Sequence, residues 1–139
     1  MKNNALISTI MSTDIIALNR EDDLERAELL FKRHKIRHIP VVNEGVIIGM
    51  LSYTDLLRIS FADAVDETET EIETLVYNMF TIDQVMVRNI VSVSSTTTIK
   101  DVAQILANSE FHALPVVDDW KLVGIVTTTD LINYLLKQL

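Results

Sequence analysis

Apolar and polar residues follow one another along the chain in a pattern that predicts the same series of short elements twice. In the first half, an extended segment over residues 14–18 precedes a helical pattern with apolar positions 24, 27, 30 and 31. Apolar runs over 39–42 and 46–51 then predict two strands, and a closing helix is expected from about Thr54-Asp55. The second half repeats this order over 89–93, 99–106, 114–117 and 122–126, with a helix from about Thr129-Asp130. Each half therefore predicts the order β-α-β-β-α.

Local signals place the ends of the first helix in each half. Asp22 or Asp23 is expected to cap one helix, and Thr97 or Thr98 the other, because their side-chain oxygens accept hydrogen bonds from free helical N–H groups. Both helices must end before the proline that follows, since a residue preceding proline avoids the helical conformation.

The two halves form a tandem repeat with a constant offset of 75 residues between 11–57 and 86–132. The identical pairs are Met11/Met86, Ile15/Ile90, Pro40/Pro115, Val41/Val116, Val42/Val117, Gly49/Gly124, Thr54/Thr129, Asp55/Asp130 and Leu56/Leu131. A unit of about 47 residues buries too little surface to be stable alone. We therefore expect an α/β fold of the α+β type, in which two units, residues 1–60 and 84–139, pack about a pseudo-two-fold axis.

The segment between the repeats, residues 61–83, has a different composition. Six acidic residues and no basic residue occupy 63–73, and a helical apolar pattern runs from Ile72 to Phe80. This acidic linker either leads into a helix that packs on the repeats or docks a partner. The run over 63–73 holds −6 of the net charge of −8, which leaves −2 for the rest of the chain.

Composition excludes several classes of function. The acidic total disfavours nucleic acid and anionic membranes, although a local basic cluster still allows a small anionic ligand. The chain has no cysteine, glycine-rich phosphate loop or nucleophile elbow, so we expect no catalytic activity. Without a signal peptide or a long apolar run, a soluble cytoplasmic protein is expected.

The repeated motifs resemble those of the cystathionine-β-synthase (CBS) domain family. Each half has an opening Met, an Ile/Leu-Pro-Val-Val strand, and a glycine nine residues after the proline that begins Gly-x-x-Ser/Thr-x-Thr-Asp. The chain resembles a stand-alone CBS pair. That resemblance implies a regulatory sensor that binds AMP, ADP, ATP or S-adenosylmethionine in clefts between the two units. It also implies a homodimer formed through the closing helices, and a regulated partner protein.

The resemblance assigns candidate ligand contacts to particular residues. Ribose and phosphate would be held by Ser52, Asp55, Thr127, Asp130, Arg37, His38, His112 and Ser12, and adenine by Ile15, Ile16, Ile90 and Val91. Ionised carboxylates accept hydroxyl hydrogen bonds, and arginine presents a planar set of donors to phosphate. The two sites should differ, because Val87 and Ala113 replace Ser12 and His38 in the second half.

Simpler structural roles compete with each of these assignments. Ser52 and Thr127 are also suited to capping a helix, Arg37 and His38 to a solvated strand edge, and the four apolar residues to a core. His34 and His38 mimic a helical metal pair, but Pro40 should end the helix before His38, so no metal site is expected.

An alternative function is a protein-interaction or structural module with vacant nucleotide clefts. The acidic run and Trp120 are its distinguishing features. Trp120 either anchors a partner or covers a local apolar patch.

Overall fold

The computed structural model describes residues 4–63 and 79–139, and the chain divides into two compact units. One unit comprises residues 16–90, and the other comprises residues 1–15 together with 91–139. The part of the predicted acidic linker over residues 64–78, with most of its acidic run and helical pattern, lies outside the described residues. None of the described helices exceeds 11 residues, and none is long and apolar enough to cross a membrane.

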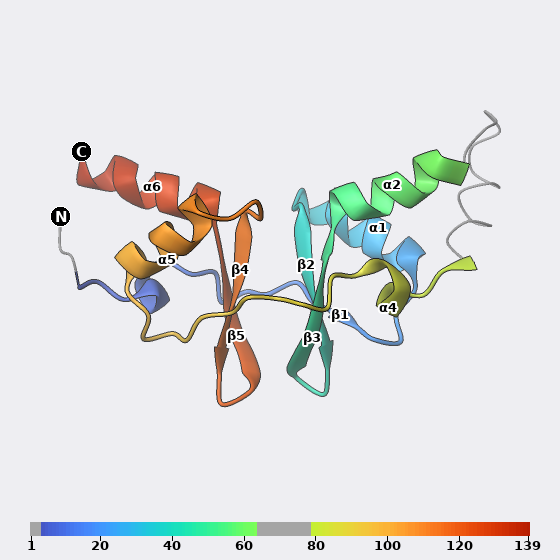
Figure 1. The fold of residues 1–139 in the computed structure, drawn as a ribbon, viewed down its shortest axis with the longest axis horizontal. Coiled ribbons are helices and arrows are strands. Elements are labelled where there is room, and N and C mark those ends of the chain that lie inside the picture. Colours follow the sequence, from blue (N-terminus) through green and yellow to red (C-terminus); the bar gives the residue numbers. More distant parts are fainter. Residues whose placement is uncertain (1–3, 64–78) are drawn as a thin grey trace. The chain divides into compact units, whose positions relative to one another are not determined.

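The unit of residues 16–90 has the predicted order of elements (Figure 1). Its elements are β1 (Leu18–Asn19), α1 (Leu24–His34), β2 (His38–Asn43), β3 (Val46–Ser52), α2 (Tyr53–Asp63) and α4 (Ile82–Val85). β1 runs parallel to β2, and β2 runs antiparallel to β3 with a register shift between Val41 and Val42. Both α1 and α2 lie on the same side of this short sheet (Figure 1).

Helix α1 forms where the sequence pattern predicts it. The Asp23 side chain accepts a hydrogen bond from the Arg26 N–H at 2.8 Å, which confirms one of the two predicted caps. The helix ends at His34, and the next residue, Lys35, has a left-handed φ of 53° five residues before Pro40. Its apolar face, which includes Leu24 and Phe31, is buried in the core of this unit.

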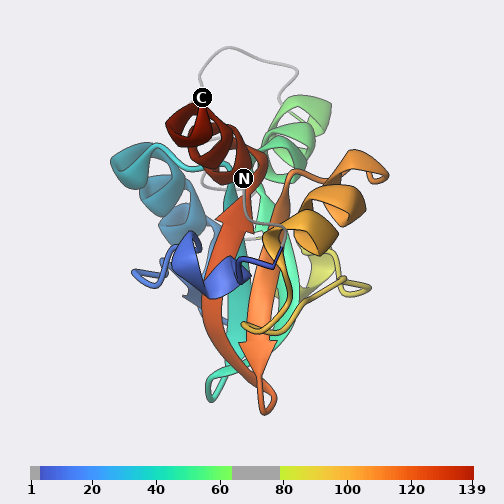
Figure 2. The ribbon, with the colours of Figure 1, turned by 90° about the vertical axis from the view of Figure 1, so that its left-hand side faces the viewer.

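The second unit repeats the arrangement with an added N-terminal segment. Its elements are η1 (Ile7–Thr9), α5 (Ile99–Ala107), β4 (Ala113–Asp118), β5 (Lys121–Thr127) and α6 (Thr128–Gln138). Thr98 caps α5 by accepting from the Asp101 N–H at 3.1 Å, as one of the two alternatives predicted. Figure 2 views this unit from the side, with the β4–β5 turn at the end of the hairpin away from α6.

The extended segments at the start of each half pair over a shorter length than the pattern predicts. β1 covers only Leu18 and Asn19, and the predicted strand over 89–93 is reduced to a bridge between Val93 and Val116. The Val93 N–H donates to the Pro115 carbonyl at 3.1 Å, and the Val117 N–H donates to Val93 at 2.8 Å. Each segment meets its neighbouring strand only at its C-terminal end, because the chain crosses to the other unit just before that point.

Each compact unit contains a short segment that belongs to the other half of the sequence. Ser12 exchanges two backbone hydrogen bonds with Ile125 at 2.9 and 3.0 Å, and Val87 exchanges two with Met50, both at 2.9 Å. A methionine therefore crosses over a glycine in both units. A Cβ on Gly124 would lie 2.5 Å from Met11 Sδ, and one on Gly49 would lie 2.9 Å from Met86 Cγ. These close contacts explain why both residue pairs are identical in the repeat.

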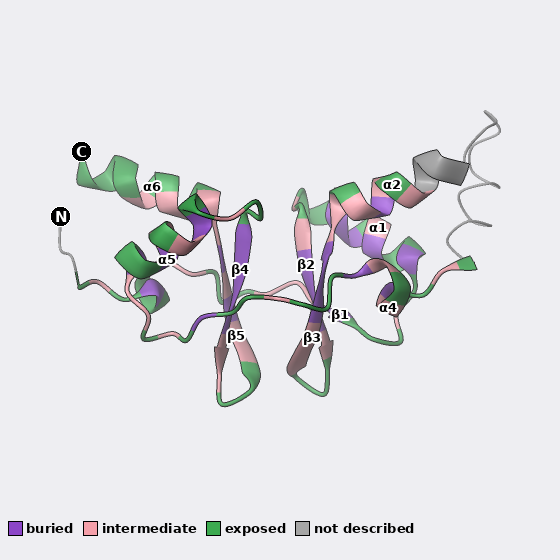
Figure 3. Ribbon diagram, viewed as in Figure 1, coloured by how far each residue is buried: buried purple, intermediate pink, exposed green. Residues whose placement is uncertain are grey.

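Two separate hydrophobic cores hold the units (Figure 3). In the unit of residues 16–90, Ile82 and Met86 of the α4 region are buried with the residues of α1, β2 and β3. In the other unit, Ile7 from the N-terminal segment is completely buried with residues of α5, β4 and β5. Each core thus depends on a segment contributed by the other half of the repeat.

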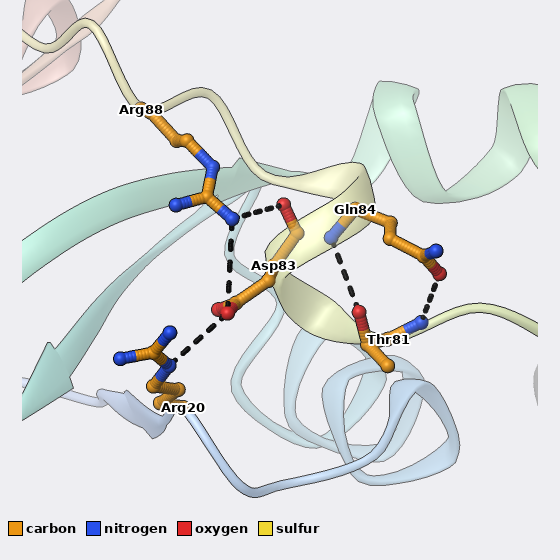
Figure 4. A network of polar contacts seen from close by, with 5 residues as sticks. All are labelled: Arg20, Thr81, Asp83, Gln84 and Arg88. Carbon is orange, nitrogen blue, oxygen red and sulfur yellow. Dashed lines mark hydrogen bonds and ion pairs between the residues drawn. The ribbon is translucent and has the colours of Figure 1, made fainter.

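A polar network fastens α4 inside its unit (Figure 4). Asp83 accepts from Arg20 at 3.1 Å and lies 3.7 Å from Arg88, which also donates to the Asp83 carbonyl at 3.3 Å. Thr81 and Gln84 form a capping box at the start of the helix, with hydrogen bonds of 2.9 and 3.3 Å. Because both arginines are more than half exposed, this network positions α4 more than it stabilises the fold.

Candidate functional site

The first candidate site lies where β3 passes into α2. Ser52 is the last residue of β3, and its Oγ accepts from the Asp55 N–H at 3.0 Å. The Asp55 carboxylate is 21% exposed and pairs with Arg58 Nη1 at 3.3 Å, while the Arg58 side chain is 73% exposed. The ion pair involves Oδ1, and the partly exposed carboxylate can accept a hydrogen bond from an external hydroxyl. Arg58 is not among the residues predicted for this site. Its i,i+3 spacing from Asp55 could have predicted the ion pair.

Basic residues at the start of β2 lie beside this turn. The Tyr53 N–H donates to the Arg37 carbonyl at 2.9 Å, and His38 is the register partner of Ser52. The fold thus brings Arg37 and His38 next to the Ser52-x-x-Asp55 turn. The Arg37 side chain is exposed, and no carboxylate among the described residues pairs with it. Such an exposed guanidinium is suited to meeting a phosphate.

The equivalent turn between β5 and α6 has a different hydrogen-bond arrangement. Thr127 Oγ1 accepts from the Asp130 N–H at 3.2 Å, and the Asp130 carboxylate accepts from the Thr127 N–H at 2.9 Å. This reciprocal capping box occupies one oxygen of Asp130 within the helix start. The predicted capping role of Thr127 is therefore present, and Asp130 shares in it.

The remaining polar candidates of this unit lie beside the same turn. The His112 carbonyl accepts from the Thr128 N–H at 2.9 Å and from Thr128 Oγ1 at 3.3 Å. Ser12 is exposed and pairs through its backbone with Ile125, two residues before Thr127. The structure thus gathers Ser12, His112 and the Thr127-x-x-Asp130 turn in one unit.

The predicted adenine contacts are divided between the two units. Ile15 and Val91 belong to the unit that contains α5 and α6, whereas Ile16 and Ile90 belong to residues 16–90. Ile15, Ile16 and Ile90 are half-buried, and Val91 is exposed. Ile16 also packs on the core of its unit, so its core role is present whatever else it contacts.

The spacing of His34 and His38 does not form a helical metal pair. Helix α1 ends at His34 and His38 begins β2, which confirms the predicted helix end before His38. Over residues 4–63 and 79–139, no group of three or more histidine and acidic side chains is arranged to hold a metal ion.

Comparison with curated proteins finds relatives along almost the whole chain. The CBS domain-containing protein YhcV of Bacillus subtilis is 29% identical over 125 residues, which cover 90% of this chain and 81% of YhcV. The uncharacterized protein MJ1225 of Methanocaldococcus jannaschii is 26% identical over 133 residues, covering 94% of this chain. The chain spans about half, 47%, of the length of MJ1225.

Solved structures share the fold. The CBS domain pair of protein MJ0100, crystallised in complex with 5'-methylthioadenosine and S-adenosyl-L-methionine, has a TM-score of 0.78 at 25% identity, covering 97% of this chain and 98% of that one. CBSX2 in complex with AMP has a TM-score of 0.80 at 23% identity, covering 96% and 98%. The family model of the CBS domain matches residues 7–62 and again residues 82–137. With most of its residues in these two matches, the chain belongs to the CBS domain family as a tandem pair.

Proposed function

We propose that this chain is a regulatory module that binds AMP, ADP, ATP or S-adenosylmethionine and carries out no chemical step itself. The observation that carries the proposal is the Ser52-x-x-Asp55 turn, where the partly exposed Asp55 carboxylate lies beside Arg37 and His38. The CBS pair of MJ0100, whose crystals hold two adenosine derivatives, supports the ligand class.

The chemistry of a nucleotide matches this arrangement. The Asp55 carboxylate accepts hydrogen bonds from neighbouring ribose hydroxyls, and charge-assisted bonds of this kind are strong. Arg37 and His38 offer donors to a phosphate, or to the carboxylate of S-adenosylmethionine. In the other unit, Thr127, Asp130, His112 and Ser12 provide a second and less basic set. The half-buried Ile15, Ile16 and Ile90, with Val91, supply apolar surface for the adenine ring.

Calorimetric titration of the full chain with AMP, ADP, ATP and S-adenosylmethionine, with GMP as a control, tests the proposal. Saturable heat with at least one adenine compound, and a weaker response to GMP, is expected. Absence of heat from every adenine compound at millimolar concentration contradicts it and favours the alternative of an interaction module.

We also propose that two copies of the chain associate through α6. None of the residues of α6 is buried, although Leu131 and Tyr134 contact the core of their unit. Its remaining apolar residues Ile132, Leu135 and Leu136 are exposed at helical spacing. A stripe of this kind is self-complementary across a two-fold axis and gains free energy when it leaves water.

Analytical ultracentrifugation tests the dimer. Leu135→Glu places a charge in the stripe and should shift the protein towards the monomer, whereas Asn133→Glu, at another exposed position of the same helix, should not. A monomeric wild-type chain at high concentration, or equal effects of both variants, contradicts the proposal.

A further inference from the structure

The turn between β4 and β5 contains an unusual residue for its backbone conformation. Asp118 and Lys121 pair across the hairpin, so Asp119 and Trp120 alone form the turn, with φ of 50° and 71°. Two consecutive residues with positive φ define the type I′ hairpin turn, in which the second position favours glycine. A side chain with a Cβ is strained there, because the Cβ crowds the following carbonyl oxygen.

The other unit shows how the same turn is built without this strain. There Asn43 pairs with Val46, and the turn residues are Glu44 and Gly45, with φ of 52° and 83°. Gly45 is the position that corresponds to Trp120 in the repeat. The fold therefore accepts glycine at this position, and a tryptophan stands there at a cost in stability.

Packing of the Trp120 side chain does not offset this loss of stability. Trp120 is 81% exposed, so it covers no apolar patch, contrary to one of the two roles considered from the sequence. The turn lies at the end of the hairpin away from α6 and α5 (Figures 1 and 2), and it is exposed in Figure 3. Tryptophan is the residue type most enriched among residues that dominate binding energy at protein interfaces. A strained and exposed tryptophan thus points to a binding role.

The base of the turn is held in place. Asp118 accepts from the Ser95 N–H at 3.0 Å and from Ser95 Oγ at 2.5 Å. These bonds also hold the pKa of Asp118 below its usual value, so its carboxylate is ionised at neutral pH. A turn fixed in this way loses little conformational entropy when it binds a partner.

The charges around the tryptophan indicate the character of that partner. Asp118 and Asp119 precede Trp120, and Lys121 follows it. Residues 118–121 therefore carry a net charge of −1 within a chain of −8. Complementary charge steers association and excludes partners of like sign. An arginine of the partner would also gain by stacking on the exposed indole face.

We infer that Trp120 is a docking residue that inserts into an apolar site, rimmed by arginine or lysine, on the surface of a partner protein. This role is independent of nucleotide binding at the Ser52 and Thr127 turns. It assigns the β4–β5 turn as the interaction surface and identifies the partner by its chemistry.

Selection from a random displayed-peptide library on the full chain, with counter-selection on Trp120→Gly, tests the inference. The enriched peptides should combine arginine or lysine with large apolar residues. Because Trp120 is the only tryptophan, its fluorescence reports directly on titration with a synthesised peptide. Trp120→Gly, followed through a dye on the peptide, should weaken binding at least tenfold.

Two controls separate loss of binding from loss of fold. Trp120→Gly should raise Tm by roughly 3–5 °C, since it relieves backbone strain. The reciprocal variant Gly45→Trp should lower Tm but bind the selected peptide as the wild type does. Calorimetry with adenine nucleotides should give the same result for Trp120→Gly as for the wild type, whichever way that result falls.

Three results would overturn the inference. They are the absence of any enriched peptide, enriched peptides without basic residues, and equal binding to Trp120→Gly and to the wild type. A blue shift of the Trp120 fluorescence with neutral phosphatidylcholine vesicles would assign the residue to a lipid surface and would also overturn it.

Discussion

The two units have the same elements and nearly the same turn sequence, yet the aspartate that both repeats share makes different contacts in each. In the α6 unit, Asp130 closes a capping box with Thr127 and so acts within the fold. In the unit of residues 16–90, the Asp55 carboxylate pairs with the exposed side chain of Arg58. The same Thr-Asp-Leu sequence thus places one carboxylate in a helix cap and the other in an ion pair with an exposed arginine.

The surroundings of the two turns differ in the same direction. Arg37 and His38 lie beside Asp55, whereas His112 and Ala113 occupy the corresponding positions beside Asp130. In the α6 unit, the hydroxyl of Ser12 partly compensates for the missing basic side chain. The corresponding residue in the other unit is Val87. If the turns bind ligands as proposed, we expect the Ser52 turn to take an anionic group and the Thr127 turn a less charged one.

The largest expected difference between the units is in the loss of stability when a side chain is added to Gly49 or Gly124, the two glycines that a methionine crosses. Gly49→Ala places a Cβ against Met86, which is buried, and 3.0 Å from the Val87 carbonyl oxygen. Gly124→Ala meets Met11, which is only half-buried and has more room to move. We expect a loss of about 2–3 kcal/mol for Gly49→Ala and about 1 kcal/mol for Gly124→Ala in urea unfolding. Equal losses would show that both methionines are equally confined.

The next effect concerns ligand affinity. Asp55→Asn should weaken binding of the best adenine ligand by roughly tenfold, about 1.4 kcal/mol, because it removes a charge-assisted acceptor. Asp130→Asn should weaken binding less, since its carboxylate already serves the capping box. Calorimetry on both variants measures the difference. A greater loss with Asp130→Asn would reverse the proposed ranking of the two turns.

Helix capping should show the opposite ranking. Thr127→Ala removes the bond from the Asp130 N–H, which is one side of a capping box, and should cost about 1 kcal/mol. Ser52→Ala removes the bond from the Asp55 N–H and should cost roughly half as much. Thermal unfolding without ligand gives both values. Thr54 is exposed and lies outside the cap bonds, so Thr54→Ala serves as the matched control.

The smallest expected effect depends on pH. Asp118 has a lowered pKa because it accepts from Ser95, so the ionised form stabilises the α6 unit. That contribution is complete above the ordinary pKa of 3.8 and is lost as the pH falls through the lower folded-state value. Ser95→Ala should flatten the fall of Tm in this acid range.

The corresponding residues in the other unit provide the control for this pH effect. Asn43 and Arg20 occupy the positions of Asp118 and Ser95, and Asn43 does not titrate. Asn43→Ala should therefore leave the acid dependence of Tm unchanged. An unaltered slope in Ser95→Ala would show that the Ser95 bonds are not its source.

Local patterns in the sequence predicted much of this fold. Asp23 and Thr98 cap their helices, and α1 and α5 end before the prolines, because these preferences depend on a few neighbouring residues. The repeat and its motifs identified the CBS family and the positions of both strand-to-helix turns. The residues assigned to the ligand remain predictions.

Other features depend on contacts that a local pattern does not encode. Asp55 and Asp130 make different side-chain contacts at turns of nearly identical sequence. The shortness of β1 and the crossing of Met11 over Gly124 depend on pairing between residues far apart in the chain. The sequence did not show that Trp120 is exposed, because anchoring a partner and covering a local apolar patch are both compatible with its position in the turn.

The crossing of the chain also has a consequence for biosynthesis. Residues 16–90 are contiguous, so this unit has all of its parts once residue 90 has left the ribosome. The other unit starts with residues 1–15 but needs Ile125 to pair with Ser12, more than a hundred residues later. Domains generally fold as they are synthesised, and distant pairings are slow to form. We therefore expect residues 16–90 to fold first, while Ile7 of the N-terminal segment remains unburied.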